Sequence, residues 1–311
     1  MNAHTSLTVS FCTFKRAHRL EKLVAALRAQ ACPIPFEILV INNNSPDDTL
    51  KVLSALQQQS GAPLRVVTES EPGIVPARNR ALNESINQDI LVFLDDDELP
   101  QPGFLAAAHD AIVNEGAHCV GGRIDIDYTP CTRPGWLDDE VAGFLGMLDH
   151  GTTAFWLDDD TRPIWSGNTA YSLPYFRERP NLRFDTRYNR TGDGVGGGED
   201  AMMLRSLLAL GAKIRYRPDM AVWHAVDPWK LNRRYFIHLH YQAGIRQAQF
   251  GMPDFPTSFL GFPLFMLRQL SKHLLSTLTL FLTGKPGLIR QAMNTSNALG
   301  AIVGYRRRTT T

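Results

Sequence analysis

The stretch Ile90-Leu91-Val92-Phe93-Leu94-Asp95-Asp96-Asp97-Glu98-Leu99-Pro100 changes from wholly apolar to acidic at Asp95. A short apolar run of this kind is typical of a buried strand in a parallel sheet. Ligands of open α/β sheets bind beyond the carboxyl ends of such strands, so we expect the three aspartates at the ligand-binding edge. Three adjacent aspartates are a weak motif by themselves, and a solvated acidic turn is the simpler alternative.

Adjacent carboxylates repel one another, and burying them is costly without a cation nearby. No lysine or arginine lies between Arg80 and Arg123, so the neighbouring sequence supplies no such cation. A hard divalent cation with oxygen ligands, Mg²⁺ or Mn²⁺, would neutralise the three side chains. If the segment is extended, Asp95 and Asp97 point to one side and Asp96 to the other.

Strand and helix patterns alternate along the first two thirds of the chain. We expect strands at residues 7–11, 36–41, 64–68, 90–94, 119–126, 165–173, 213–216 and 221–223. We expect helices at residues 19–30, 48–59, 77–86, 104–114 and 199–210, with an irregular stretch at 129–161. This order predicts an α/β fold with a doubly wound, mostly parallel sheet over residues 1–225. The pattern of residues 226–311 predicts a helical extension.

Polar motifs occur in a fixed order at the ends of these elements. They are Cys12–Arg16, Asn42–Ser45, Gly73 with Ala77–Ala81, Asp95–Asp97, Ser166–Asn168, Gly198–Asp200 and His224. Over residues 7 to about 225, the ordered set resembles the family-2 inverting glycosyltransferases of the Rossmann-like GT-A fold. The resemblance implies transfer of a sugar from a nucleotide-diphosphate sugar to a hydroxyl of a glycan or lipid-linked saccharide, with Mn²⁺ or Mg²⁺ as cofactor. The net charge of +1 argues against a nucleic-acid partner.

The resemblance also implies where the donor and the metal bind. In the family's DxD motif the first aspartate lies near the ribose and the second approaches the metal, which implies these roles for Asp95 and Asp97. His224 matches a third metal ligand of some GT-A enzymes, although a structural histidine is the alternative. The donor-binding residues implied are Thr13, Arg16, Asn42, Asn43, Arg78, Asp95 and Asp96, and the metal ligands are Asp97, Asp95 and His224.

Two of these assignments have simpler alternatives. The family often has aspartate at the position of Asn42 or Asn43, accepting from the uracil N3–H. An amide oxygen can still accept, so a UDP-sugar is favoured while dTDP and GDP donors stay open. The alternative is a turn built from residues that tolerate a left-handed conformation. For Arg78 the alternative is an exposed residue near a helix start.

The resemblance places the catalytic carboxylates at Glu199 and Asp200. Inversion by direct displacement needs a carboxylate that takes the proton of the acceptor hydroxyl. The family's Glu-Asp motif implies Asp200 as this base and Glu199 as a group that holds the acceptor. Trp165, Gly167 and Asn168 would line the acceptor side. The alternative is an acidic pair favoured by the helix dipole at a helix start.

The carboxy-terminal residues 255–311 combine many large apolar side chains with purely basic charge, since no acidic residue follows Asp254. This composition predicts contact with an anionic membrane surface, with Arg306–Arg308 as an electrostatic tether. The alternative is packing on the first domain or on a second subunit. The longest apolar runs are too short to span a bilayer, and the amino-terminus does not have the pattern of a signal peptide. With four cysteines and no CxxC pair, the sequence predicts a cytoplasmic protein, peripheral on the inner face of the plasma membrane.

Three rival functions fit parts of the pattern. A sugar-nucleotide pyrophosphorylase would have a glycine-rich loop after the first strand, and Cys12–His18 contains no glycine. A phosphatase would place its nucleophilic aspartate after the first strand. A non-catalytic sugar-nucleotide or glycan-binding module could keep the fold, but it would not need both Asp95–Asp97 and Glu199-Asp200.

Overall fold

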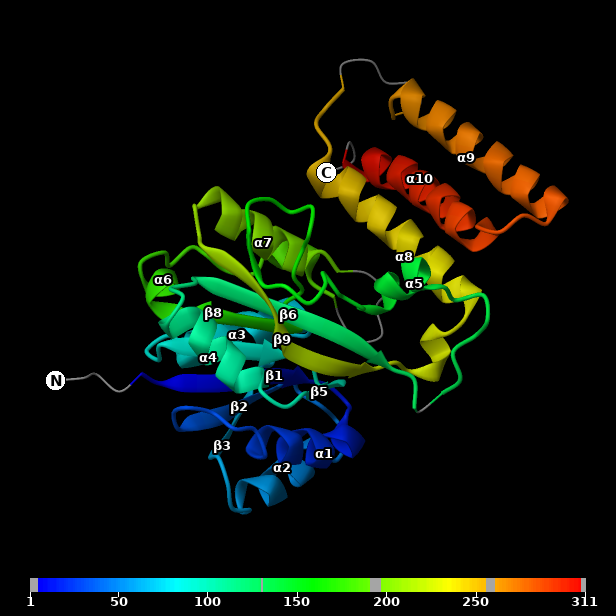
Figure 1. The fold of residues 1–311 in the computed structure, drawn as a ribbon. Helices are drawn as coiled ribbons and strands as arrows, with labels where there is room; N and C mark the ends of the chain where they lie inside the picture. The colour runs from blue at the N-terminus through cyan, green and yellow to red at the C-terminus, as the bar shows by residue number, and fades with distance from the viewer. Residues whose placement is uncertain (1–4, 130, 191–196, 256–260, 309–311) are drawn as a thin grey trace. The chain divides into compact units, whose positions relative to one another are not determined.

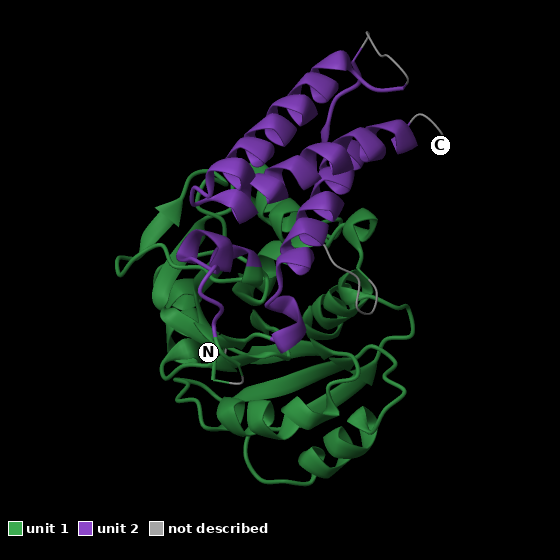
Figure 2. Cartoon of the chain, turned by 90° about the vertical axis from the view of Figure 1, so that its right-hand side faces the viewer, with its two compact units in different colours: residues 1–132, 145–192, 198–226 green, residues 133–144, 193–197, 227–311 purple. Residues whose placement is uncertain are grey.

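The computed structural model describes residues 5–129, 131–190, 197–255 and 261–308. The chain forms two compact units (Figures 1 and 2). The first comprises residues 1–132, 145–192 and 198–226, and the second comprises residues 133–144, 193–197 and 227–311. The second unit therefore contains the carboxy-terminal helices together with two earlier segments that the sequence alone did not assign to it.

The first unit is built around one mixed sheet. Its strands are β1 (Leu7–Thr13), β2 (Phe36–Asn42), β3 (Leu64–Thr68), β4 (Ile90–Leu94), β5 (Glu98–Pro100), β6 (Cys119–Asp127), β7 (Phe155–Leu157), β8 (Asn168–Ser172) and β9 (Ile214–Ala225). The spatial order is β3-β2-β1-β4-β8-β6-β9-β5, with β7 paired to β9. The strands β3, β2, β1 and β4 run parallel, as do β6 and β9, whereas β8 runs antiparallel to both β4 and β6. Because β1, β2 and β4 run parallel, their carboxyl ends lie at the same edge of the sheet.

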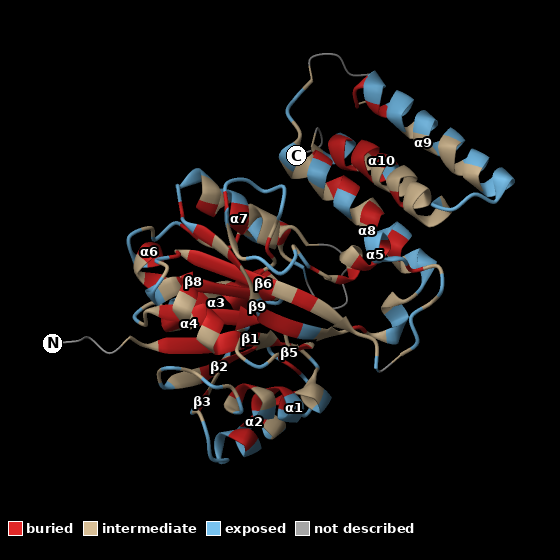
Figure 3. Cartoon of the chain, in the orientation of Figure 1, coloured by how far each residue is buried: buried red, intermediate tan, exposed pale blue. Residues whose placement is uncertain are grey.

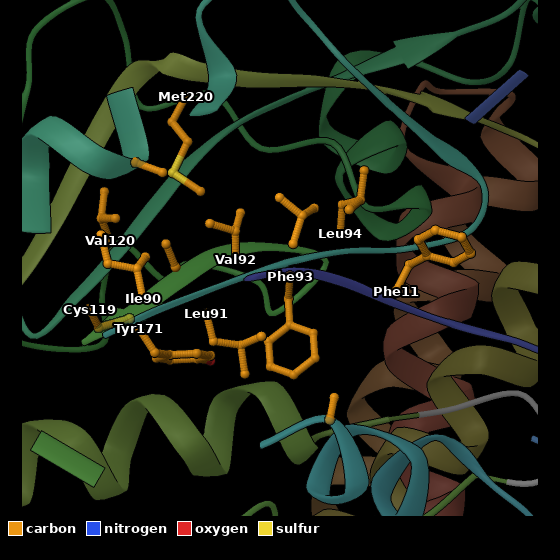
Figure 4. Close-up of a cluster of buried hydrophobic side chains, with 14 of the residues drawn as sticks. Phe11, Ile90, Leu91, Val92, Phe93, Leu94, Cys119, Val120, Tyr171 and Met220 are labelled. Atoms are coloured by element: carbon orange, nitrogen blue, oxygen red, sulfur yellow. The ribbon is translucent and has the colours of Figure 1, made fainter. Parts of the chain in front are cut away.

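Helices cover both faces of this sheet (Figure 3). They are α1 (Ala17–Arg28), α2 (Thr49–Gln57), α3 (Ile74–Ser85), α4 (Phe104–Val113), α6 (Leu173–Arg177) and α7 (Glu199–Ala209). The strand β4 is buried along its whole length, because its side chains alternate between two apolar layers (Figure 4). Phe93 packs edge-on against Tyr171 on one face, while Val92 points to the other face. The α/β fold with a mostly parallel sheet and carboxy-terminal helices is confirmed.

Two strand predictions differ from the structure. The expected strand at 165–173 begins only at Asn168, because the Asn168 N–H donates to the Trp165 carbonyl in a turn (2.9 Å). It ends at Ser172, because α6 begins at Leu173 with Pro174 in its first turn. The two short strands expected at 213–216 and 221–223 form the single strand β9, whose pairing with β6 shifts register between Gly122 and Ile124. A local irregularity of this kind looks like a strand break in sequence.

The second unit consists mainly of α8 (Arg233–Arg246), α9 (Leu264–Thr283) and α10 (Leu288–Arg308), with the short α5 (Asp139–Ala142). The backbones of α8 and α10 touch through glycines. A Cβ atom on Gly300 would lie 2.1 Å from the Tyr241 carbonyl oxygen, and one on Gly304 would lie 2.1 Å from that of Ile245. Only glycine permits this approach at these positions, so the three missing methyl groups at Gly244, Gly300 and Gly304 determine how closely the two helices pack.

Helix α9 packs on α10 by one side. The Thr277 and Thr295 hydroxyls are hydrogen-bonded at 2.8 Å, and Met266 joins the apolar cluster around Ile302 and Tyr305. Arg308, which the sequence suggested as part of a membrane tether, bonds the Asp254 carboxylate at 3.0 Å. Over the four described ranges, no helix combines the length and hydropathy that crossing a bilayer requires.

Candidate active site

The acidic run after β4 forms a turn. The Glu98 N–H donates to the Asp95 carbonyl at 3.1 Å, which closes the turn over Asp96 and Asp97. The segment is therefore not extended, so the condition under which Asp95 and Asp97 would point to one side is not met. The three carboxylates instead meet three different partners, contributed by α3, β1 and β9.

Arg78 on α3 joins the acidic turn to α7. Its guanidinium lies 3.0 Å from Asp95, 3.2 Å from Glu199 and 2.7 Å from Asp200. Its side chain is only 4% exposed, so the alternative of an exposed helix-start residue is wrong. Burial opposes its charge, but the charges of Asp200, Asp95 and Glu199 raise the pKa of Arg78 well above its ordinary value. The cation that the neighbouring sequence did not supply comes from this helix.

The position of Arg78 depends on how α3 begins. Gly73 precedes the helix with φ = 123°, a conformation that favours glycine. Its N–H donates to the Asn43 side-chain oxygen at 2.7 Å, while the Asn43 amide donates to the carbonyls of Glu69 and Glu71. Asn43, which follows β2, thus uses both ends of its amide to fix the β3–α3 connection. On this evidence the turn-forming alternative for the asparagine run has a physical basis.

Asn42 differs from Asn43 in its hydrogen bonding. Its side chain is fully buried, and its oxygen accepts from the Ser45 N–H at 3.1 Å. Its amide nitrogen has no hydrogen-bond partner among the described residues. An unpartnered buried donor is costly, and Asn42 differs from Asn43 in having one among the described residues.

Asp96 lies against the end of β1. Its carboxyl group accepts a hydrogen bond from the Thr13 hydroxyl at 2.7 Å. Burial, and then the charge of Asp97, raises the pKa of Asp96 to about 7, although the Thr13 hydrogen bond and the charge of Arg16 oppose the rise. The predicted donor residues Thr13, Arg16 and Asp96 are thereby brought together at one strand end.

Glu98 is a site residue that the sequence interpretation missed. It is buried, and its carboxylate accepts from the Asp95 N–H at 2.9 Å. Burial, followed by the charge of Asp95, raises its pKa well above the ordinary value. Gly167 presses on the same group, since a Cβ there would lie 2.9 Å from Asp95 Oδ2 and 3.1 Å from Glu98 Oε1. The continuous acidic run was the available signal, but the short strand β5 that buries Glu98 was not predicted.

Asp97 lies near His224. Pairing of β5 with β9 sets Glu98 opposite His224, and the Ala225 N–H donates to the Asp97 carbonyl at 2.9 Å. The His224 Nε2 and Asp97 Oδ1 atoms are consequently 3.5 Å apart, and His224 Nδ1 is buried without a hydrogen-bond partner among the described residues. A carboxylate with an imidazole suits Mn²⁺. Within the part of the chain that the structure describes, no three potential metal ligands converge on one point.

Glu199 and Asp200 begin α7, directly after Gly198. Glu199 is buried, and its Oε2 atom has no hydrogen-bond partner among the described residues. Burial and the charge of Asp200 raise the pKa of Glu199, whereas Arg78 opposes this. Asp200 keeps a quarter of its side chain exposed, so Arg78 holds one buried and one accessible carboxylate side by side.

The predicted acceptor-side residues have different surroundings. Asn168 is buried, and its amide donates to the carbonyls of Arg123 and Met220. Gly167 contacts the acidic turn as described, and Trp165 is half-buried against the core. Gly167 is thus the one of the three that touches the carboxylate cluster.

Comparison with known proteins identifies the family. Residues 8–180, more than half of the chain, match the family described as Glycosyl transferase family 2. The chain belongs to glycosyl transferase family 2. The matched range contains Arg78, the acidic turn and Gly167, whereas α7 and His224 lie beyond it.

Two curated relatives of this family-2 chain are similar over part of their length. Glycosyltransferase AglE of Haloferax volcanii is 26% identical over 123 residues, which cover 39% of this chain and 40% of the relative. The uncharacterized glycosyltransferase YfnE of Bacillus subtilis is 32% identical over 102 residues, which cover 33% of this chain and 26% of the relative. The matches span less than half of either relative.

Solved structures share the fold of this family-2 chain. A mannosyltransferase from Pyrobaculum calidifontis, in complex with GDP-Man and Mn²⁺, superposes with a TM-score of 0.61 at 17% identity, covering 97% of this chain and 88% of the other. TarS residues 1–349 of S. aureus, in complex with UDP-GlcNAc, gives 0.55 at 15% identity, covering 80% and 68%. GalNAc-T7 with UDP, GalNAc and Mn²⁺ gives 0.57 at 15% identity, covering 81% and 52%.

Proposed function

We propose that this chain is an inverting glycosyltransferase that moves a sugar from a nucleotide-diphosphate sugar to a hydroxyl group of an acceptor. One observation carries the proposal: Arg78 holds the strand-end carboxylate of Asp95 and the α7 carboxylates of Glu199 and Asp200 in one cluster. Donor binding and proton removal are thereby assigned to neighbouring groups. A non-catalytic binding module would not need the accessible carboxylate of Asp200 at the start of α7.

Asp200 is proposed as the general base. Its exposed edge can take the proton of the acceptor hydroxyl, while Arg78 orients the carboxylate through a 2.7 Å contact. Glu199, buried beside it, is proposed to hold the acceptor or the loop around it. Gly167, Trp165 and the buried Asn168 are proposed to form the acceptor side.

The cofactor is proposed to be Mn²⁺ or Mg²⁺, held by Asp97 and His224 with Asp95. The acidic turn and α7 together contribute six carboxyl groups, and Arg78 is the cation bonded to three of them. This group of carboxylates, with His224 Nε2 3.5 Å from Asp97 Oδ1, fits a divalent cation. When bound, the metal would stabilise the negative charge that grows on the departing diphosphate. Two of the three solved neighbours carry Mn²⁺.

The donor is proposed to be a UDP-sugar. Thr13, Arg16 and Asp96 gather at the end of β1, and the Asn42 amide nitrogen, which has no partner among the described residues, lies at the end of β2. The neighbours TarS and GalNAc-T7 contain UDP or a UDP-sugar, while the mannosyltransferase contains GDP-Man. A GDP-sugar is therefore the first competitor to test.

The acceptor is proposed to be a glycan or a lipid-linked saccharide in polysaccharide biosynthesis. We place the enzyme on the inner face of the plasma membrane, bound peripherally. The support is the acid-free, apolar carboxy-terminal stretch after Asp254.

A donor screen tests the proposed function. Thermal shift with UDP-, dTDP- and GDP-sugars, with and without Mn²⁺, names the nucleotide, because a bound ligand raises the melting temperature. Release of nucleoside diphosphate is then followed with EDTA and with Asp97→Ala. We expect metal-dependent turnover that Asp97→Ala removes. Donor binding without any transfer or hydrolysis would favour the binding module, and full activity in EDTA would refute the metal.

A further inference from the structure

Helix α9 carries large apolar side chains that the second unit does not cover. Among the described residues sixteen large hydrophobic side chains are exposed, and half of them lie in this one helix. They are Leu264, Phe265, Leu267, Leu274, Leu275, Leu278, Phe281 and Leu282. Exposure reaches 68% at Phe281 and 73% at Leu282 (Figure 3). An exposed apolar surface of this density marks an interaction site.

These side chains form one face of the helix. At the spacing of an α-helix, all except Phe265 fall within an arc of about 120°. Met266 and Thr277 lie outside this arc and make the contacts with α10. The helix therefore packs on α10 by one side, and the exposed arc is a different side. We call this exposed arc the outer face of α9.

The charges beside the outer face are all basic. Arg268 and Lys272 border it on the helix, and Lys285 follows the helix end; all three are exposed. No acidic residue occurs after Asp254. Two copies of the chain paired through this face would bring like charges together with no carboxylate from the same stretch to pair with them. An anionic partner complements the face, and a second copy does not.

We infer that the outer face of α9 lies in the headgroup region of an anionic lipid bilayer. Leu274, Leu278 and Phe281 would enter the boundary of the acyl chains, while Arg268 and Lys272 meet lipid phosphates. Because no described helix is suited to crossing the bilayer, α9 would lie along the surface. The inference deepens the membrane location given under Proposed function by naming the surface responsible.

Vesicle sedimentation of the full chain tests the inference without donor, acceptor or metal. Its outcome is thus separate from that of the glycosyl-transfer assay. We expect binding to phosphatidylcholine vesicles that contain phosphatidylglycerol, weak binding to pure phosphatidylcholine, and loss on raising the salt concentration. Each basic residue near the surface contributes about 1 kcal/mol, so Arg268→Gln and Lys272→Gln should each weaken binding about fivefold.

Two double variants separate the face from general hydrophobicity. Leu274→Glu/Leu278→Glu should weaken binding at least about tenfold with an unchanged melting temperature, because both side chains are exposed. The control Leu50→Glu/Leu210→Glu adds the same charge at exposed leucines of the first unit and should bind as the parent does. Equal loss in the control, or no binding of the parent to anionic vesicles, would overturn the inference. So would a dimer in sedimentation velocity that Leu274→Glu/Leu278→Glu dissociates, if the parent ignores vesicles. Should that variant fail to fold, the Arg268 and Lys272 variants decide.

Discussion

Arg78 and Arg217 each contact three carboxylates, but their surroundings differ. Arg78 bonds Asp95, Glu199 and Asp200 between α3, the acidic turn and α7. Arg217 on β9 bonds Asp110, Glu115 and Asp219, and Arg215 provides Glu115 with a second cation.

The difference lies in the balance of charge and in solvation. Arg78 is 4% exposed, and the buried Glu98 and the partly buried Asp96 add further acid to its neighbourhood. Among the partners of Arg78, Glu199 is only 4% exposed, whereas Asp95 and Asp200 (40% and 25%) are about as exposed as the partners of Arg217 (27% to 57%). Water therefore shares the cost of charge everywhere except at Glu199. Arg78 and Arg217 thus form the same number of ion pairs, but the first belongs to the candidate active site and the second to a surface network. A tally of salt bridges would not distinguish them.

The largest expected effect is on turnover. Asp200→Asn keeps the shape of the side chain and removes the proposed base, so turnover should fall by ~10²–10⁴ while donor binding barely changes. Steady-state kinetics and donor titration measure the two quantities. Asp219→Asn makes the same chemical change in the other cluster and should leave turnover as it is. Loss of donor affinity with normal turnover in Asp200→Asn would contradict the assignment.

The next effect is on stability. Arg78→Met leaves the buried carboxylate of Glu199 without its cation and should lower the free energy of unfolding by about 3–5 kcal/mol. Arg217→Met removes a cation whose partners are solvated, and its cost should stay below about 1 kcal/mol per pair. Urea titration of both variants gives the comparison. Similar losses in the two variants would mean that burial does not separate the clusters.

The third effect concerns the support of Arg78. Asn43→Asp would set a carboxylate against the carbonyl oxygens of Glu69 and Glu71, where the amide now donates. We expect a loss of about 1–3 kcal/mol, measured by thermal or urea unfolding. Asn44→Asp, at the exposed next position, should be nearly neutral. If Asn43→Asp instead kept its stability and changed nucleotide preference, Asn43 would contact the base.

The smallest effect is a pH dependence in the Arg217 cluster. Hydrogen bonds from Arg217 lower the pKa values of Asp110 and Asp219 below the ordinary 3.8. A folded-state pKa below the unfolded one adds stability above the unfolded pKa, and this is lost as pH falls through the folded pKa. The difference in unfolding free energy between parent and Arg217→Met should thus be largest near neutral pH and shrink below about pH 4. A constant difference down to about pH 2 would show that packing, not charge, is responsible.

The sequence predicted those parts of the fold that local pattern controls. The predicted bounds of β4 agree with the structure. A strand that is covered on both faces of a sheet is apolar along its length, so the first charged residue marks its end. The ends of β1 and β2 were correct to within two residues. The continuous strand β9 was missed because its continuity depends on pairing with the distant strand β6. The late start of β8 was missed because a turn between Trp165 and Asn168 precedes the strand.

The candidate site shows the same limit. The motifs identified Asp95, Arg78 and Asp200 as candidate site residues. They did not predict that Arg78 contacts the two carboxylates, because 122 positions separate Arg78 from Asp200. Glu98 was overlooked because its surroundings come from distant segments, namely β9, which pairs with β5, and Gly167. Motif order in a sequence identifies the participants, whereas charge compensation between them depends on tertiary structure.

The glycine contact between α8 and α10 has a consequence for local opening. Gly244, Gly300 and Gly304 leave no space between the two backbones, so neither helix can fray without separating from the other. Amide protons along this pair should exchange with solvent only when the whole unit opens, whereas those of α9, packed by one side, should exchange through local openings. Helix α9 could then open and refold locally while α8 and α10 stay folded.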